Sequence, residues 1–382
     1  MCIRDRHNHS LSKGPTVVVG RKGSVGEVHF SSSTCWPIDT TYYVDEFPDG
    51  FPPKYWAFYL KSLRLGTHDK SSAIPGVSRK DIYGIEVPVP PPAEQHRIVA
   101  KLEKLLAKVE ASQERLNKIP ALLKRFRQSV LAAACSGRLT CDWRGDNNYE
   151  YDVPVNWKET KIGDLTSLVT SGSRGWAKYY SQKGAMFIRA QNINADCLDL
   201  SDIAYVDLPN RTEGLRTRVR KDDLLVTITG ANVTKSAIVL EDLDNAYVSQ
   251  HVALVRLKDI KLSSFIFYWL LSPAHGRAQL LESAYGQGKP GLNLDNIRNV
   301  NVWLPTGPEQ QEIVRRVEAL FKIADQIEER YKKAKAYIDK LTQSILAKAF
   351  RGELVPQDAN DEPASALQRI RKVPLERRSL KT

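Results

Sequence analysis

One stretch of this chain occurs twice at a constant spacing. The first copy covers residues 94–139 and the second covers 309–354, so each matched pair lies 215 positions apart (309 minus 94, and 354 minus 139). A gap-free repeat of this length indicates that the two copies share one structure. Identical pairs include Ile98/Ile313, Glu103/Glu318, Arg115/Arg330, Gln128/Gln343, Ser129/Ser344 and Ala134/Ala349.

Each copy has apolar residues at alternating four- and three-residue spacing. That spacing, sustained over several heptads, predicts a long helix with a coiled-coil seam. Pro120 should kink or interrupt the first helix near Ile119, and Gly137 should end it. The predicted interface consists of Ile98, Leu102, Leu105, Val109, Leu116, Leu123, Phe126, Val130, Ile313, Val317, Leu320, Ile327, Ile338, Leu341 and Ile345.

The stretches outside the repeat mix strand and turn signals. Strands are predicted over 223–230 and 248–257, and short helices over 55–65 and 264–271. Prolines close each mixed region just before a long helix, because proline does not enter a helix interior. The predicted order is a first globule (1–92), a helix (93–139), a linker (140–156), a second globule (157–305), a helix (306–354) and a polar tail (355–382).

The constant spacing also predicts where the first globule should begin. The second globule begins near Trp157, so a first globule of similar size should begin roughly 60 residues before Met1. We therefore expect the first globule to be truncated at its front, and the leader MCIRDRHNH not to be native sequence.

Composition narrows the class of protein. The net charge of +12 is compatible with a polyanionic partner without requiring one. The chain has no apolar run long enough to span a bilayer and no secretory signal, which favours a cytoplasmic protein. No cysteine pair has zinc or redox spacing, which argues against structural zinc and a disulfide framework; the five cysteines are Cys2, Cys35, Cys135, Cys141 and Cys197.

Several catalytic motifs fail on their context. The glycines at 286–291 spell GxGxxG, but Pro290 prevents the helix that a dinucleotide loop must begin. Glu159 and Lys161 match half of a nuclease pattern, without a convincing metal-binding aspartate upstream. His251 lacks a companion nucleophile, and a hydrogen-bonded strand histidine explains it better. We predict a chain without catalytic residues, cofactor or metal.

Polar turns remain as candidate binding sites. Residues 170–180 combine hydroxyls, a guanidinium, glycines and aromatics, and residues 189–194 offer arginine and amide side chains that can read base edges. An ordinary glycine-rich connection and a polar strand end are the alternatives for these two stretches. The predicted DNA-binding residues are Ser171, Ser173, Arg174, Trp176, Lys178, Tyr179, Arg189, Gln191, Asn192, Asn194, Thr229, Asn232, Gln287, Lys289, Arg21, Lys22 and Ser24.

Corresponding turns of the two globules differ in chemistry. The turn 229–232 corresponds to 21–24, and the turn 286–289 corresponds to 71–74. Two copies of one scaffold with different turns would read two different sequences.

The whole pattern resembles the DNA-specificity subunit of type I restriction–modification systems. The resemblance rests on the globule–helix–globule–helix order and on a proline ahead of Glu-Gln-x-x-Ile-Val at each helix start (94–99 and 309–314). It also rests on Ser-Val/Ile-Leu-Ala-x-Ala-x-x-Gly-x-Leu at each helix end (129–139 and 344–354).

This resemblance implies a fold and a set of partners. The fold would be α+β, with two target-recognition domains of mixed α/β structure joined by an antiparallel coiled coil in a pseudo-two-fold repeat. The helices, about 60 Å long at 1.5 Å per residue, would act as a ruler between two DNA half-sites. Two methyltransferase subunits using S-adenosylmethionine would dock on the chain, and restriction translocase subunits using ATP and Mg would join them.

Two other functions stay open. The first is an assembly scaffold in which the coiled coil holds partners and the globules bind no DNA. The second is an enzyme, such as a fused nuclease or methyltransferase, which the absent motifs disfavour.

Overall fold

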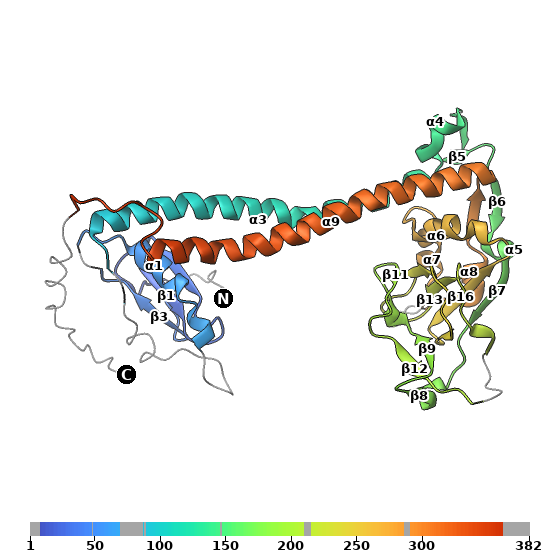
Figure 1. Cartoon of the computed structure of the whole chain (residues 1–382), viewed down its shortest axis with the longest axis horizontal. Coiled ribbons are helices and arrows are strands. Elements are labelled where there is room, and N and C mark those ends of the chain that lie inside the picture. Colours follow the sequence, from blue (N-terminus) through green and yellow to red (C-terminus); the bar gives the residue numbers. More distant parts are fainter. Residues whose placement is uncertain are drawn as a thin grey trace. The chain divides into compact units, whose positions relative to one another are not determined.

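The computed structural model describes residues 8–47, 49–68, 87, 89–145, 147–209, 215–285 and 291–361. The chain divides into two compact units: unit 1 contains Met1–Lys118 with Arg330–Thr382, and unit 2 contains Ile119–Glu329. Each unit combines one globule with one half of each of two long helices, α3 (Pro92–Cys135) and α9 (Gly307–Phe350) (Figure 1). The predicted α+β architecture, with two globules joined by two helices, is confirmed.

Unit 1 contains a three-stranded antiparallel sheet in the order β2-β1-β3. The central strand β1 (Thr16–Gly20) is a valine-rich run that is buried throughout, between β2 (Val28–Ser31) and β3 (Thr41–Val44). The helix predicted over 55–65 is α1 (Pro53–Ser62); a proline suits its first position because that N–H has no partner in the helix. A short 3-10 helix, η1 (Leu65–His68), follows α1.

Helix α1 connects this sheet to the long helices. It lies between the sheet and the ends of α3 and α9 (Figure 1). Tyr55 is 1% exposed and belongs to one apolar cluster with Ile98 and Leu346. The Tyr55 and Phe350 rings meet edge to face at 5.4 Å, and burial raises the pKa of the Tyr55 phenol.

The main sheet of unit 2 has four antiparallel strands in the order β14-β13-β16-β7. These are β7 (Thr166–Ser171), β13 (Leu224–Thr227), β14 (Ser236–Ile238) and β16 (Val252–Leu257). One face packs against α6 (Ser263–Leu271), an almost wholly buried helix whose cluster also includes Ile313 and Val317 of α9. The other face packs against a second sheet.

The second sheet of unit 2 has the order β15-β9-β12-β8. Its strands are β8 (Tyr180–Ser181), β9 (Ala185–Ile188), β12 (Ala204–Val206) and β15 (Ala246–Val248), and only β15 and β9 pair in parallel. Besides short 3-10 helices, the other α-helices and strands in the described part of unit 2 are α4 (Cys141–Arg144), β4 (Tyr149–Glu150), β5 (Val153–Pro154), β6 (Lys158–Lys161), α5 (Ile162–Leu165), β10 (Ile193–Asn194), β11 (Cys197–Leu198), α7 (Gly276–Ser283), α8 (Leu294–Arg298) and β17 (Asn301–Leu304).

The sheet of unit 1 repeats part of the unit 2 sheet. In both units a central strand pairs antiparallel with the next strand in its own sheet and with the strand that precedes a helix packed on that sheet. Thus β1, β2, β3 and α1 correspond to β13, β14, β16 and α6. The sequence repeat therefore extends into the globules as a repeat of structure.

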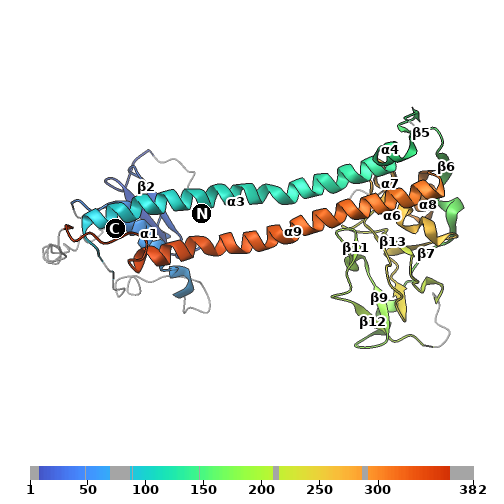
Figure 2. The same cartoon turned by 45° about the horizontal axis from the view of Figure 1, so that its top comes forward.

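The long helices pair in opposite directions. In unit 1 the beginning of α3 packs against the end of α9, with Ile98, Val99 and Leu102 beside Leu346. In unit 2 the end of α3 packs in one cluster with the beginning of α9, with Val130 and Leu131 accompanying Ile313. The two segments run alongside each other in each unit (Figure 2). The predicted antiparallel pairing is confirmed.

Most predicted seam residues are buried or half-buried in the structure. Ile98, Leu102, Leu123, Val130, Ile313 and Val317 are buried, and Leu105, Val109, Leu116, Leu320, Ile338, Leu341 and Ile345 are half-buried.

Two seam predictions are wrong. Phe126 and Ile327 are 38% and 42% exposed. A polar contact takes their place: the Arg127 guanidinium donates to Asp325 at 2.6 Å and to Glu328 at 3.0 Å. The seam therefore passes through Arg127 and leaves the neighbouring apolar side chains outside.

Repeated residues make repeated contacts. The Gln95 amide donates to the Pro90 carbonyl at 2.9 Å, and the Gln310 amide donates to the Pro305 carbonyl at 2.7 Å. Both long helices are followed by a glycine in the left-handed region, Gly137 at φ 70° and Gly352 at φ 77°. The start and the stop of each helix are thus built in the same way.

Three local predictions need correction. Helix α3 is not interrupted at Pro120, because the packed seam on both sides outweighs the loss of one backbone hydrogen bond; a kink there stays a prediction. The predicted linker 140–156 contains α4 and the hairpin of β4 and β5, and Thr140 is fully buried. The predicted strand 248–257 is divided, with β15 and β16 in different sheets and a turn at 249–251 between them.

The start of α9 is held by a buried carboxylate. Glu309 is 1% exposed and accepts hydrogen bonds from the Arg144 guanidinium at 2.6 Å, the Thr140 hydroxyl at 2.9 Å and the Trp157 indole at 3.2 Å. Arg144 also donates to the Gly137 carbonyl at 3.2 Å. This network joins the end of α3, helix α4 and the start of α9.

Removing the Glu309 carboxylate should destabilise unit 2. We predict that Glu309→Ala lowers the free energy of unfolding by about 3–5 kcal/mol, because Arg144 is left buried without a counter-charge. Urea unfolding followed by circular dichroism measures this. Glu353→Ala, which removes an exposed pair with Arg351, is the control and should stay near the wild type; equal effects of the two substitutions would contradict the assignment.

Acid should weaken the beginning of α9. Hydrogen bonds from Arg315 and Arg316 lower the pKa of Glu312 from 4.5 to about 2. A group with a lowered folded pKa contributes stability that is present above its unfolded pKa and is lost as pH falls toward its folded pKa. We predict a stability decrease between about pH 4.5 and pH 2 that becomes shallower in Glu312→Gln. Thermal melts across this range test it, and an unchanged slope in the variant would refute it.

Candidate nucleic-acid interface

Three turns meet at one end of the main sheet of unit 2. They are residues 171–174 after β7, residues 189–194 after β9, and residues 228–232 after β13. The turn 249–251 links them: the Ser249 carbonyl accepts from Gly172 N–H at 3.2 Å, Ser249 N–H donates to Ile188 at 2.8 Å, and the His251 carbonyl accepts from Ile228 N–H at 3.0 Å. Three of the predicted turns of unit 2 are therefore joined through residues 249–251.

The approach of the first turn to this link requires glycine. A Cβ atom on Gly172 would lie 2.2 Å from the Val248 carbonyl oxygen and 2.7 Å from the Gln250 nitrogen. Any side chain there would separate the turn from residues 249–251.

The turn after β7 presents cations and hydroxyls. Arg174 and Lys178 are exposed, and Ser171 and Ser173 are half-buried. The Lys178 ammonium lies 5.0 Å from the centre of the half-buried Tyr179 ring. Arg216, which the sequence analysis did not identify, donates from Nε to the Thr170 hydroxyl at 3.0 Å and is itself exposed. Guanidinium and ammonium groups on an exposed turn suit contacts with DNA phosphates.

Trp176 is a core residue, which corrects its assignment to DNA binding. Its indole is 4% exposed, stacks on Phe187 with ring centres 5.7 Å apart and meets Tyr247 edge to face at 5.5 Å. The aromatic signal in residues 170–180 thus reflects packing of the second sheet.

The turn after β9 is mostly occupied by contacts of its own. Asn192 is 2% exposed and donates to the Asp199 and Asp202 carbonyls, so it holds the turn and does not face solvent. Arg189 and Gln191 both bond to Asp202, at 2.8 Å to its carbonyl and 3.0 Å to its carboxylate respectively. Hydrogen bonds from Ser201 lower the pKa of the Asp199 carboxyl.

Of this group, Asn194 and Gln191 are exposed. Asn232 is directed inward: its amide donates to the Ala190 carbonyl at 3.3 Å and to the Ile193 carbonyl at 3.5 Å. Asn192 and Asn232 are therefore wrong as base-reading residues, since their amides already bond to the backbone.

Thr229 is half-buried and forms a polar row with two exposed residues that the sequence analysis did not select for DNA binding. Its hydroxyl lies 2.5 Å from His251 Nδ1, and His251 Nε2 lies 3.1 Å from the Gln250 amide nitrogen. Sequence reasoning assigned 248–257 to one strand; the polar Ser-Gln-His within an apolar run was the available signal of a turn. Gln287 and Lys289 lie outside the described residues.

In unit 1 the corresponding turn joins β1 to β2. Its backbone segments approach so closely that a Cβ atom on Gly20 would lie 1.9 Å from the Ser24 carbonyl oxygen. The Arg21 guanidinium lies 5.7 Å from the centre of the Tyr42 ring, and Lys22 is exposed. This turn is basic where its unit 2 counterpart is neutral.

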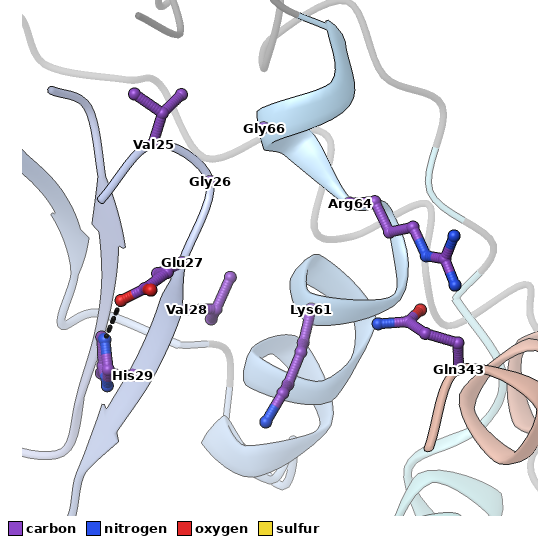
Figure 3. Close-up of a pocket in the computed structure, with 9 residues that line it drawn as sticks. All are labelled: Val25, Gly26, Glu27, Val28, His29, Lys61, Arg64, Gly66 and Gln343. Carbon is purple, nitrogen blue, oxygen red and sulfur yellow. Dashed lines mark hydrogen bonds and ion pairs between the residues drawn. The ribbon is translucent and has the colours of Figure 1, made fainter. Parts of the chain in front are cut away.

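A pocket of about 490 Å³ lies beside this turn. Figure 3 shows Lys61 and Arg64 on one side, Glu27 paired with His29 at 3.3 Å on the other, and Gln343 of α9 turned toward Arg64. Gly26 and Gly66 let its walls approach, since a Cβ on Gly26 would lie 2.1 Å from the Gly66 nitrogen. The pocket is mixed in charge and open.

The described residues contain no group of three or more His, Cys, Asp or Glu side chains arranged to hold a metal ion. Among the helices of the described ranges, none combines the length and apolarity that crossing a membrane requires.

Comparison with known proteins identifies the family. Residues 4–121 and 154–336 match the family described as "Type I restriction modification DNA specificity domain". The chain is 37% identical over 315 residues to the type I restriction enzyme EcoBI specificity subunit of Escherichia coli, with 80% of this chain and 65% of the relative covered. It is 32% identical over 327 residues to the StySPI specificity subunit of Salmonella potsdam, covering 81% and 67%.

Solved structures share the fold. A chain from a structure describing complex assembly and conformational transition of the type I R-M system superposes with a TM-score of 0.65 at 16% identity, covering 90% of this chain and 83% of that one. The HsdS subunit from Thermoanaerobacter tengcongensis superposes at 0.54 with 18% identity, covering 90% and 82%. The chain spans about two thirds of the length of its curated relatives, and it belongs to the family of type I restriction–modification DNA specificity domains.

Proposed function

We propose that this chain is a sequence-specific DNA-reading subunit of a type I restriction–modification complex. The observation that carries the proposal is the pair of equivalent sheets that end in turns of different chemistry, basic at 21–24 and neutral at 229–232. Two domains with the same fold but different turns can recognise a DNA target whose two half-sites differ in sequence. The relatives named as specificity subunits support this function.

The surface of unit 2 contains both kinds of contact that a DNA reader needs. Arg174 and Arg216 are exposed cations that can pair with phosphates, and Gln250, Gln191 and Asn194 are exposed amides that can bond to base edges. The hydrogen bonds through Ser249 fix the turns relative to one another. A preformed surface loses less conformational entropy on binding.

The chemistry of modification and cleavage belongs, in this proposal, to partner subunits in the cytoplasm. A methyltransferase partner would supply S-adenosylmethionine, and a translocase partner would supply ATP and Mg. This chain would contribute recognition and assembly without catalytic residues of its own.

We propose an apolar patch on the helices of unit 2 as the docking surface for a methyltransferase subunit. It consists of Leu122, Phe126, Ile323 and Ile327, which are 50%, 38%, 50% and 42% exposed. Leu122 precedes the buried Leu123, and Ile323 precedes the buried Ala324. In an antiparallel pair, positions that precede the seam lie on the same flank of both helices, so these four side chains form one patch.

Large apolar side chains that face solvent on two neighbouring helices mark an interaction surface. Helices of a partner would bury this patch in the way that helices bury one another's apolar faces.

Arg174 tests the DNA-reading proposal. We predict that Arg174→Ala in the complex with the methyltransferase partner weakens DNA binding and lowers the salt slope of log K by about 1. Equilibrium binding across a range of salt concentrations measures both. Arg315→Ala, an exposed arginine of α9 paired with Glu312, is the matched control and should leave the slope unchanged.

The same titration separates the proposal from an assembly scaffold. If the wild-type complex shows no preference for any genomic fragment over unrelated DNA, the DNA-reading function fails and the scaffold remains.

The docking patch has its own test. We predict that Phe126→Ser with Ile327→Ser weakens association with the methyltransferase subunit roughly tenfold or more, because burial of each large apolar side chain contributes about 1.5–3 kcal/mol. Analytical ultracentrifugation measures the complex. Leu240→Ser, 70% exposed on unit 2 outside the helices, is the control. Unimpaired association of the double variant would place docking elsewhere.

A further inference from the structure

We infer that Gln250 reads an adenine in one half of the DNA target and that His251 and Thr229 orient its amide. The inference rests on the proposed DNA-reading function and adds the residue and the base. Its basis is the row Thr229–His251–Gln250 at the point where the three turns of unit 2 meet.

The backbone under Gln250 is held from both sides. Ser249 is 4% exposed and bonds through its N–H to Ile188 and through its carbonyl to Gly172 and Val252. The His251 carbonyl accepts from Ile228. Residues 249–251 thus join β15 of one sheet to β16 of the other. Their backbone also forms hydrogen bonds with Ile188 at the end of β9, Gly172 just after β7 and Ile228 just after β13. The side chain of Gln250 is therefore exposed, while the backbone on either side of it is held by hydrogen bonds.

The imidazole determines which way the amide of Gln250 faces. A neutral imidazole donates from one nitrogen and accepts at the other. When Thr229 Oγ1 accepts from Nδ1–H at 2.5 Å, Nε2 accepts an N–H from the Gln250 amide at 3.1 Å. The second amide N–H and Oε1 then remain for a ligand.

That pair has the pattern of adenine in the major groove. A glutamine amide binds adenine bidentately, accepting from the N6 amino group and donating to N7. Guanine presents two acceptors there, so it would leave Oε1 facing an acceptor. With the amide held by His251, the preference for adenine needs no further ordering of the side chain when DNA binds.

The surroundings can place DNA at this site. Arg174 lies two residues beyond Gly172, which bonds directly to Ser249, and Arg216 bonds to Thr170 of the same strand. Both arginines are exposed. At this end of the sheet the two arginines could contact phosphates and position the DNA, while the Gln250 amide could bond to a base edge.

The test uses the full chain assembled with its methyltransferase partner and a randomised double-stranded DNA library. Selection and sequencing give the preferred sequence of each variant. The wild type should select two defined half-sites. Gln250→Ala should lose its preference at one adenine in one half-site, with discrimination there falling roughly 5- to 100-fold, and should keep every other position.

Gln250→Glu sharpens the test. A carboxylate accepts but does not donate, so the preference at that position should move from adenine toward cytosine, whose N4 amino group donates. Gln311→Ala on α9 is the matched control and should leave the selected sequence unchanged. Melting curves of each variant confirm folding before selection.

His251→Ala and Thr229→Val test the positioning residues. Both should relax the same adenine position and no other, and should leave binding to unrelated DNA unchanged; His251→Gln, which retains a hydrogen-bonding group, should restore part of the preference. A selected sequence identical to the wild type in Gln250→Ala and Gln250→Glu overturns the inference, as does a change at a base other than adenine. A wild type that selects no sequence at all overturns the proposed DNA-reading function instead.

Discussion

The carboxylate of Glu309 is the contact on which the organisation of unit 2 depends. It is buried at the first turn of α9 and bonds to residues from the segment that follows α3 and from the start of the globule. A buried charge must be fully paired, so the three segments cannot shift independently. Glu94, its partner in the repeat, is buried at the start of α3. Both helices therefore begin with a buried acid where a globule meets the coiled coil.

The main sheet extends from that junction to the turns proposed to read DNA, and it is packed on both faces. The α6 helix packs on one face of the sheet and the second sheet packs on the other, and β15 passes directly into β16 through residues 249–251. The turns at the sheet end are thereby linked through backbone hydrogen bonds, while Arg174, Asn194 and Gln250 expose their side chains to solvent. Such a surface can change its side chains without changing its shape.

The elements predicted well are those in which a local pattern and the packing agree. Heptads predicted both long helices, and their glycine stops at Gly137 and Gly352 appear in the structure. Predictions failed where a distant partner decides the outcome. Trp176 is buried by Phe187 and Tyr247, and Asn232 bonds to carbonyls about 40 residues earlier. No window of sequence shows those contacts, and for the same reason the turn at 249–251 was read as strand.

The division between predictable and unpredictable residues follows the proposed function. Each long helix packs against the other, with Ile98 beside Leu346 and Val130 beside Ile313, so a substitution in one helix must suit the other. Turn residues such as Arg21 and Gln250 belong to neither helix, and under the proposed function a new DNA target would require new side chains on the same backbone. Under the proposed function, keeping these two kinds of residue apart would let the chain keep its partners while its target changes.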